Sequence, residues 1–285
     1  MSADSIKTVA VLGAGTMGNG IAHVFARSGY RVLLRDVDQE VLDRALGTIS
    51  KNLEREVSKN KLTAAERSAA LDRIQPVTDG KALTGADFVV EAVPEQRDLK
   101  IRILKEVDSV VGPGAIMASN TSSISITELA AQTSRPDRFI GMHFMNPVPM
   151  MALVEVINGA ATSDVTFATT MALCEKLGKT AVSVNDSPGF VSNRVLMPLI
   201  NEAAFAVMEG VAAPEAVDAV MKLGMNHPMG PLQLADFIGL DVCVEILDVL
   251  LRGFGDPKYR ACPLLRKYVA AGWLGRKSGR GFYSY

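Results

Sequence analysis

The residues best suited to acid–base chemistry lie in one apolar stretch, GMHFMNPVPMMALVEVI, which spans residues 141–157. Two apolar runs are joined by a Pro-rich turn, with His143 in the first run and Glu155 in the second. Histidine exchanges protons near neutral pH because its ordinary pKa is about 6.5. If the turn brings the runs together, Glu155 can bond one ring nitrogen and stabilise the protonated ring, leaving the other nitrogen toward a substrate. The alternative is a core histidine and an unrelated Glu, since spacing alone does not prove contact.

Two polar clusters could complete such a site. The first, SNTSSISITEL (119–129), follows an apolar run, and its candidate hydrogen-bond donors are Asn120, Ser122 and Ser123. Its serines and threonines could instead cap a helix. The second cluster, DSPGFVSNRVLMPLINE (186–202), places Asn193 and Arg194 in an otherwise apolar helical pattern. There the alternatives are an internal packing hydrogen bond for the amide and an interdomain salt bridge for the guanidinium.

A glycine motif near the N-terminus predicts a dinucleotide site. VAVLGAGTMGNG carries Gly13, Gly15 and Gly18 in the pattern G-x-G-x-x-G, after a strand and at the start of a helix. These glycines allow a tight turn, close approach of a pyrophosphate, and close packing of helix on strand. Asp36 ends the second strand, where a carboxylate binds the adenosine ribose and repels a 2′-phosphate. We therefore expect NAD rather than NADP, although a bend could bring Arg35 toward a 2′-phosphate.

The elements around these residues alternate between short β-rich runs and longer helical patterns. We expect strands at 8–13, 31–36, 87–93, 115–120, 139–144, 153–157 and 180–185. We expect helices at 16–28, 38–60, 97–110, 124–132 and 163–177, and a further short helix opened by TAAE at 63–66. Alternation of this kind predicts an α/β fold, a Rossmann-type doubly wound sheet, over residues 1–185.

The pattern changes near NDSPGF (185–190). Beyond it we expect a smaller all-α domain over residues 186–285, with helices at 189–209, 214–222, 231–252 and 260–271. The final GFYSY is the one candidate strand there. A small and very apolar helical unit often buries one face against another domain or a second subunit.

Composition excludes several other classes of protein. Of the 285 residues, 48% are hydrophobic and 21% are charged, and the net charge is −1, so no nucleic-acid or acidic-membrane footprint is visible. The three cysteines are far apart and lack metal-ligand spacing, which favours no metal and a reducing compartment. We find neither a transmembrane span nor room for a targeting peptide before the first strand. We expect a cytoplasmic protein without a membrane partner.

Taken together, the motifs resemble the L-3-hydroxyacyl-CoA dehydrogenase family over essentially the whole chain. The resemblance rests on GAGTMGNGIA, EAVPEQRDLKIRILKEVD, ASNTSSISITELA, RFIGMHFMNPVPMMALVEVI, SPGFVSNRVLMPLINEA, NHPMGPLQLADFIGLD and GRKSGRGFYSY. It implies an NAD-dependent enzyme that interconverts an S 3-hydroxyacyl-CoA and its 3-oxo form, and it favours a four-carbon acyl chain. It also implies a homodimer formed through the helical domain.

The resemblance assigns roles to individual residues. His143 matches the family's catalytic base and Glu155 its carboxylate partner. The residues that match substrate-binding polar groups are Ser122 and Asn193, and those that match positions around the nicotinamide half of the cofactor are Glu95, Lys100 and Asn120.

A basic stripe suggests a site for the CoA phosphates. Lys51, Arg55 and Lys59 are spaced to share one helix face, and in the family this region lies near the CoA portion of the substrate. An ordinary solvated face is the alternative, because Glu54 and Glu56 partly balance the charge.

Two other functions are compatible with the same architecture. A lens crystallin-type gulonate dehydrogenase shares the His and Glu arrangement but acts on a sugar acid, and the basic stripe and SNTSSISIT argue against it. A non-catalytic NAD(H)-binding dimer would have no need of the set His143, Glu155, Ser122 and Asn193.

Overall fold

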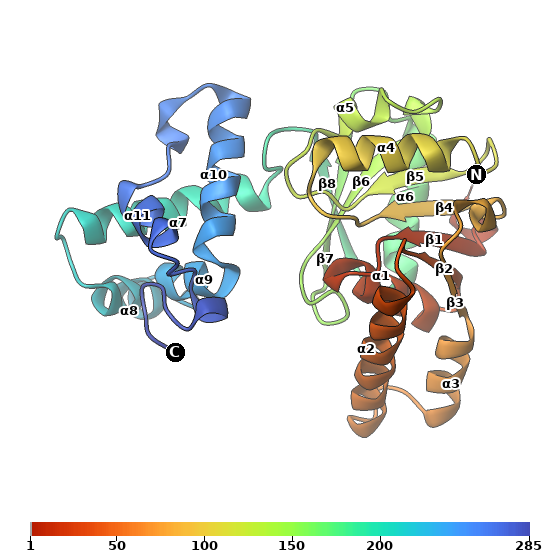
Figure 1. Ribbon diagram of the computed structural model, residues 1–285, viewed down its shortest axis with the longest axis horizontal. Coiled ribbons are helices and arrows are strands. Elements are labelled where there is room, and N and C mark those ends of the chain that lie inside the picture. Colours follow the sequence, from red (N-terminus) through yellow and green to blue (C-terminus); the bar gives the residue numbers. More distant parts are fainter. Residues whose placement is uncertain (1) are drawn as a thin grey trace. The chain divides into compact units, whose positions relative to one another are not determined.

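A computed structural model describes residues 2–285 (Figure 1). The chain divides into two compact units, Met1–Asp186 and Ser187–Tyr285, next to the boundary expected after residue 185. No helix among residues 2–285 combines the length and apolar character that a membrane crossing requires.

The first unit is built on one sheet of eight strands in the order β3-β2-β1-β4-β5-β6-β7-β8. All neighbouring strands run parallel except β6 and β7, which are antiparallel. The near-continuous apolar sequences of β4, β5 and β6 suit strands that are covered on both faces, and every residue of these three strands is buried. The strands are β1 Thr8–Leu12, β2 Arg31–Arg35, β3 Ile74–Val77, β4 Phe88–Glu91, β5 Ile116–Ser119, β6 Phe139–Phe144, β7 Leu153–Asn158 and β8 Thr180–Asn185.

Helices cover both faces of this sheet, as the predicted doubly wound fold requires (Figure 1). One layer contains α1 Thr16–Arg27, α2 Gln39–Ser58, α3 Ala64–Asp72 and α6 Asp164–Lys176. The main core lies between this layer and the sheet, and it includes Phe25, Ile49 and Leu173. The opposite face carries α4 Arg97–Asp108 and α5 Ile126–Ala130. Single 3-10 turns are found at Ala3–Ser5, Gly80–Leu83 and Pro136–Arg138.

Local sequence accounts for most of these elements. The TAAE segment forms the predicted capping box, in which Thr63 caps Glu66 N and the Glu66 carboxylate accepts from Thr63 N. Strand β3 was missed because Pro76 interrupts its apolar pattern. It lies at the edge of the sheet, where a residue without an N–H group is tolerated.

The second unit consists of helices, as expected, with two differences from the sequence prediction. Gly239, at φ 107°, divides the predicted helix 231–252 into α9 and α10. The final GFYSY forms isolated bridges rather than a strand, and Asp236 accepts from Phe282 N and Tyr283 N at 3.0 Å each. The elements are α7 Ser192–Met208, α8 Pro214–Gly224, α9 Pro231–Ile238, α10 Leu240–Phe254 and α11 Pro263–Ala270, with 3-10 turns at Pro257–Tyr259 and Arg276–Ser278.

Candidate active site

His143 and Glu155 lie opposite each other on the hairpin of β6 and β7. They are register partners in the antiparallel ladder, so both side chains leave the same face of the sheet. His143 Nδ1 is 2.7 Å from Glu155 Oε2, and the two residues are 6% and 2% exposed. An ionised carboxylate can only accept a hydrogen bond, so Nδ1 carries the proton in this contact, and in the neutral ring Nε2 presents a lone pair. The contact that sequence spacing left open is therefore present.

Ser122 provides the group next to Nε2. It follows β5, whose end lies beside β6, and its Oγ is 3.0 Å from His143 Nε2. The alternative of helix capping applies to a neighbouring residue instead, since Ser125 is the N-cap of α5 and accepts from Glu128 N. Ser122, His143 and Glu155 thus form a hydrogen-bonded series, in which His143 contacts Ser122 through Nε2 and Glu155 through Nδ1.

The connection between β6 and β7 is held by hydrogen bonds from a buried lysine. Lys179, 6% exposed, donates to Val148 O at 2.5 Å and to Met151 O at 2.7 Å. On α1, a Cβ added at Gly20 would lie 2.8 Å from Val148 Cβ, which shows how closely the helix approaches. The connection also contains the cis peptide bond Asn146-Pro147. These contacts hold the closed end of the hairpin against the rest of the unit.

The Glu95 carboxylate holds the loop that carries Ser122. It accepts from Thr121 Oγ1 at 2.5 Å, from Ser122 N at 2.9 Å, and from Ser123 N and Oγ at 3.0 Å each. Burial alone would raise the pKa of Glu95, but Lys100 and the hydroxyl donors outweigh burial and keep this pKa below its usual value. The carboxylate is therefore charged at neutral pH, which strengthens its hydrogen bonds to the loop.

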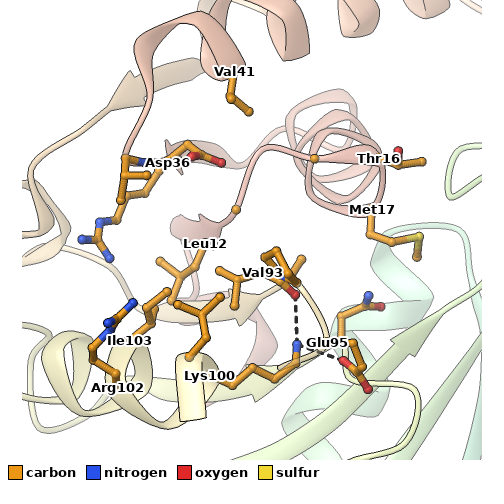
Figure 2. A pocket seen from close by; sticks show the side chains of 18 of the residues that line it. Leu12, Thr16, Met17, Asp36, Val41, Val93, Glu95, Lys100, Arg102 and Ile103 are labelled. Carbon is orange, nitrogen blue, oxygen red and sulfur yellow. Dashed lines mark hydrogen bonds and ion pairs between the residues drawn. The ribbon is translucent and has the colours of Figure 1, made fainter. Parts of the chain in front are cut away.

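Glu91 is a member of the site that sequence reasoning did not identify. It ends β4 and is 0% exposed, and Lys100 on α4 is 1% exposed. Lys100 Nζ lies 2.7 Å from Glu91 Oε1. It also lies 3.2 Å from Glu95 Oε2 and 3.1 Å from Val93 O (Figure 2). Ser119 Oγ donates to Glu91 Oε2 at 2.5 Å. Two carboxylates thus compensate one buried ammonium group.

The glycine loop has the geometry expected from its sequence. Gly13, at φ 92°, makes the turn after β1, and an added Cβ would lie 2.7 Å from Ala92 O. At Gly18 a Cβ would lie 1.7 Å from Gly13 O, so this glycine allows α1 to pack on the loop. A Cβ at Gly15 would meet nothing within 4 Å, so the backbone before α1 faces open space. The exposed N–H groups of a helix start suit an anionic group there.

A cavity of about 890 Å³ lies beside this loop (Figure 2). Asp36 lines it, with Oδ2 accepting from Ala14 N at 2.8 Å and Oδ1 from Val37 N at 2.8 Å. Figure 2 places Asp36 and Glu95 toward opposite ends of the cavity. Of the residues predicted from the sequence to bind cofactor or substrate, the lining includes Gly13, Gly15, Asp36, Glu95, Lys100, Asn120 and Ser122.

The other predicted residues have the following positions. Asn120 is buried and accepts from Phe144 N at 2.9 Å, so it joins the loop after β5 to the end of β6. Asn193 belongs to the second unit, near the start of α7, and its role remains a prediction. Arg194 lies over the Phe254 ring at 4.3 Å within that unit. Lys51 and Arg55 are exposed on α2, whereas Lys59 is the C-cap beyond the helix.

This arrangement can move a proton beside a dinucleotide-sized cavity. A buried imidazole with a carboxylate on Nδ1 can take a proton at Nε2 and be stabilised while it carries the charge. The hydroxyl of Ser122 marks where a substrate oxygen can bond the same ring nitrogen. The residues present also fit a nicotinamide dinucleotide, because the open backbone at Gly15 and the Asp36 carboxylate match the needs of a pyrophosphate and a ribose.

Family models and known proteins match nearly the whole chain. The family model "3-hydroxyacyl-CoA dehydrogenase, NAD binding domain" matches residues 8–187, and "3-hydroxyacyl-CoA dehydrogenase, C-terminal domain" matches residues 189–285. A Bacillus subtilis (strain 168) protein named "Probable 3-hydroxybutyryl-CoA dehydrogenase" is 58% identical over 280 residues, which are 98% of both chains. A Bradyrhizobium diazoefficiens protein named "3-hydroxybutyryl-CoA dehydrogenase" is 54% identical over 280 residues, 98% of this chain and 96% of that one.

A solved structure gives the same result. The crystal structure of (S)-3-hydroxybutyryl-CoA dehydrogenase PaaH1 from Ralstonia eutropha has a TM-score of 0.97 and 54% sequence identity, and the match covers 99% of each chain. Fold, site geometry and sequence similarity agree that this chain belongs to the 3-hydroxyacyl-CoA dehydrogenase family.

Proposed function

We propose that the protein catalyses the reversible, NAD(H)-dependent interconversion of (S)-3-hydroxybutyryl-CoA and acetoacetyl-CoA. The observation that carries this proposal is the hydrogen-bonded series of Ser122, His143 and Glu155 beside the cavity of the glycine loop. The substrate class follows from family membership. The four-carbon chain is supported by relatives at 54–58% identity whose names specify 3-hydroxybutyryl-CoA.

His143 acts as the acid and base in this proposal. In the oxidative direction Nε2 takes the proton of the 3-hydroxyl group, and Glu155 stabilises the resulting imidazolium through Nδ1. In the reductive direction the same nitrogen returns the proton to the 3-oxygen. Ser122 and Asn193 hold the substrate oxygen and its neighbours. Both the low exposure of the pair and its apolar surroundings strengthen the interaction between ring and carboxylate.

The cofactor in this proposal is NAD(H), held along the cavity. The loop of Gly13 and Gly15 faces the pyrophosphate and Asp36 accepts from the adenosine ribose. Glu95, Lys100 and Asn120 surround the nicotinamide half. When bound, the nicotinamide ring supplies the hydride acceptor or donor for carbon 3 of the substrate. The charge of Asp36 favours NAD(H) over NADP(H), because it repels a 2′-phosphate.

Family membership also suggests a binding site for the CoA phosphates and a homodimer. Lys51 and Arg55, exposed on α2, bind the CoA phosphates as point-charge and forked donors. The helical unit forms a homodimer, which is supported by exposed apolar side chains that include Val211, Val220 and Leu223.

The test is an initial-rate assay with acetoacetyl-CoA and NADH. Replacing His143 with Gln keeps hydrogen-bonding capacity but removes the titratable ring, so we expect kcat to fall by about 10²–10⁴-fold. Glu155→Gln should lower kcat in the same direction. The matched control is His227→Gln, in the second unit, which should leave kcat unchanged. Wild-type turnover by purified His143→Gln would refute the assignment of the base.

Two additional arms of this assay separate the remaining parts of the proposal. Lys51→Glu should raise KM for acetoacetyl-CoA without changing KM for NADH, and an unchanged KM would remove Lys51 from the site. Activity of the wild-type protein on gulonate but not on acetoacetyl-CoA would overturn the substrate class.

A further inference from the structure

An ion pair lies in the cavity wall next to Asp36. Arg35 Nη2 donates to Glu106 Oε1 at 2.7 Å, and the two side chains are 10% and 45% exposed. Arg35, Asp36, Arg102 and Glu106 all line the cavity. Figure 2 shows Asp36 and Arg102 at the end of the cavity remote from Glu95. This end therefore holds two guanidinium groups and two carboxylates.

Two elements bring this pair together. Arg35 is the last residue of β2, directly before Asp36. On α4 the lining residues Leu99, Arg102, Ile103 and Glu106 have the spacing of one helix face. The face of α4 that contacts the cavity therefore ends with Glu106 beside the end of β2.

Gly80 leaves the room that the pair needs. A Cβ added there would lie 2.6 Å from Glu106 Oε1 and 3.6 Å from Arg35 Cζ. Any larger side chain at this position would push the carboxylate away from the guanidinium. The pair thus lies against the backbone of Gly80, and both of its residues line the cavity.

The charge of Arg35 matters because of its place in the chain. A guanidinium next to the ribose-binding carboxylate is the group best suited to hold a 2′-phosphate, through forked hydrogen bonds. Asp36 repels such a phosphate, but its oxygens accept from Ala14 N and Val37 N, and the ion pair of Arg35 is formed with Glu106 instead. Glu106 both neutralises Arg35 and occupies one of its donors.

We propose that Glu106 is a specificity-determining residue, which holds Arg35 away from a 2′-phosphate and so favours NADH over NADPH. This inference rests on the proposed function, in which Asp36 binds the adenosine ribose at the same end of the cavity. Cofactor choice is then set by two carboxylates from different elements, Asp36 after β2 and Glu106 on α4.

The experiment measures kcat/KM with acetoacetyl-CoA for NADH and for NADPH in the full-length protein. Glu106→Ala should lower the NADH-to-NADPH ratio by about tenfold, the effect expected when one charged hydrogen bond changes partner. The change should come from a lower KM for NADPH. Partial unfolding cannot produce this result, because both cofactors are tested on one preparation.

A matched control removes the same charge elsewhere on α4. Asp98 is exposed and does not line the cavity, so Asp98→Ala should keep the wild-type ratio. The double variant Arg35→Ala with Glu106→Ala should lose the gain, since the proposal acts through Arg35. A gain that persists without Arg35, or an unchanged ratio in Glu106→Ala, would overturn the inference. A wild-type protein that prefers NADPH would overturn the proposed cofactor preference instead.

Discussion

His23, on the helix that follows the glycine loop, is buried away from water. It is 0% exposed on α1, and its Nε2 lies 3.2 Å from Glu56 Oε1. Burial lowers the pKa of His23 to about 4, because desolvation outweighs the attraction of Glu56 and Arg27 adds repulsion. Lys100, by contrast, has two carboxylates within ion-pair distance. His23 is therefore neutral in the folded protein at neutral pH.

This neutral histidine predicts a loss of stability in acid. In the unfolded chain His23 takes up a proton below about pH 6.5, whereas in the folded chain it does so near pH 4, so acid favours unfolding between these values. The contribution is on the order of 3 kcal/mol by pH 4. We expect His23→Gln to flatten the pH dependence of the urea midpoint between pH 7 and pH 4. Equal slopes for both proteins would contradict this explanation.

Single residues also show what sequence could and could not reveal. His143, Glu155 and Ser122 were predicted, and the structure brings their side chains into contact. His143 and Glu155 lie in apolar strands, where a polar side chain has few alternative positions, and Ser122 follows the strand beside them. Glu91 was missed, although it stands alone in the apolar run FVVEAV. A carboxylate in a strand covered on both faces needs a buried cation, and that requirement was the available signal. Lys100 was expected near the nicotinamide half of the cofactor, but its pairing with Glu91 could not be predicted without the packing of α4.

At the scale of the elements, two glycines of the loop before α1 should respond differently to replacement by alanine. Gly15→Ala places a methyl group in open space, so the fold should tolerate it, but the methyl stands where a pyrophosphate approaches. We expect KM for NADH to rise at least about tenfold with an unchanged Tm, a loss of roughly 1.4 kcal/mol in binding. Gly18→Ala should instead lower stability by about 1–3 kcal/mol, because its Cβ would meet Gly13 O.

The measurements are thermal unfolding and fluorescence titration with NADH on both variants. Each variant serves as the control for the other, since they differ by three positions and add the same methyl group. A Gly15→Ala protein that binds NADH normally would show that the loop does not contact the cofactor.

Helices and strands were predicted correctly where local sequence sets their ends. The predictions were wrong where the ends of an element depend on contacts with distant parts of the chain. The strands and helices around the site were predicted because apolar periodicity and capping residues are local signals. The break at Gly239 was not, since the apolar pattern continues through it and a single glycine does not end every helix. For β3, the edge position that tolerates Pro76 depends on the strand order of the whole sheet.

For the whole molecule, the proposed homodimer gives a prediction at the helical unit. Leu223 on α8 is 87% exposed, and Val220 on the same helix is 62% exposed. Large apolar side chains exposed together suit a subunit interface. We expect a particle of twice the 30.4 kDa chain mass, and Leu223→Glu should reduce it to one chain. Analytical ultracentrifugation measures this, with Leu223→Met as the apolar control that should stay dimeric. A monomeric wild type would contradict the proposal.

The hairpin of β6 and β7 keeps the pair of His143 and Glu155 assembled over time. Both strands lie inside the sheet, between β5 and β8, and His143 and Glu155 face each other across the ladder. Separating them requires breaking main-chain hydrogen bonds on inner strands, which are among the rarest fluctuations of a folded protein. Loops around the cavity can open and close at far lower free-energy cost. The proposed proton acceptor therefore stays assembled from one turnover to the next, and each arriving substrate meets it in its finished form.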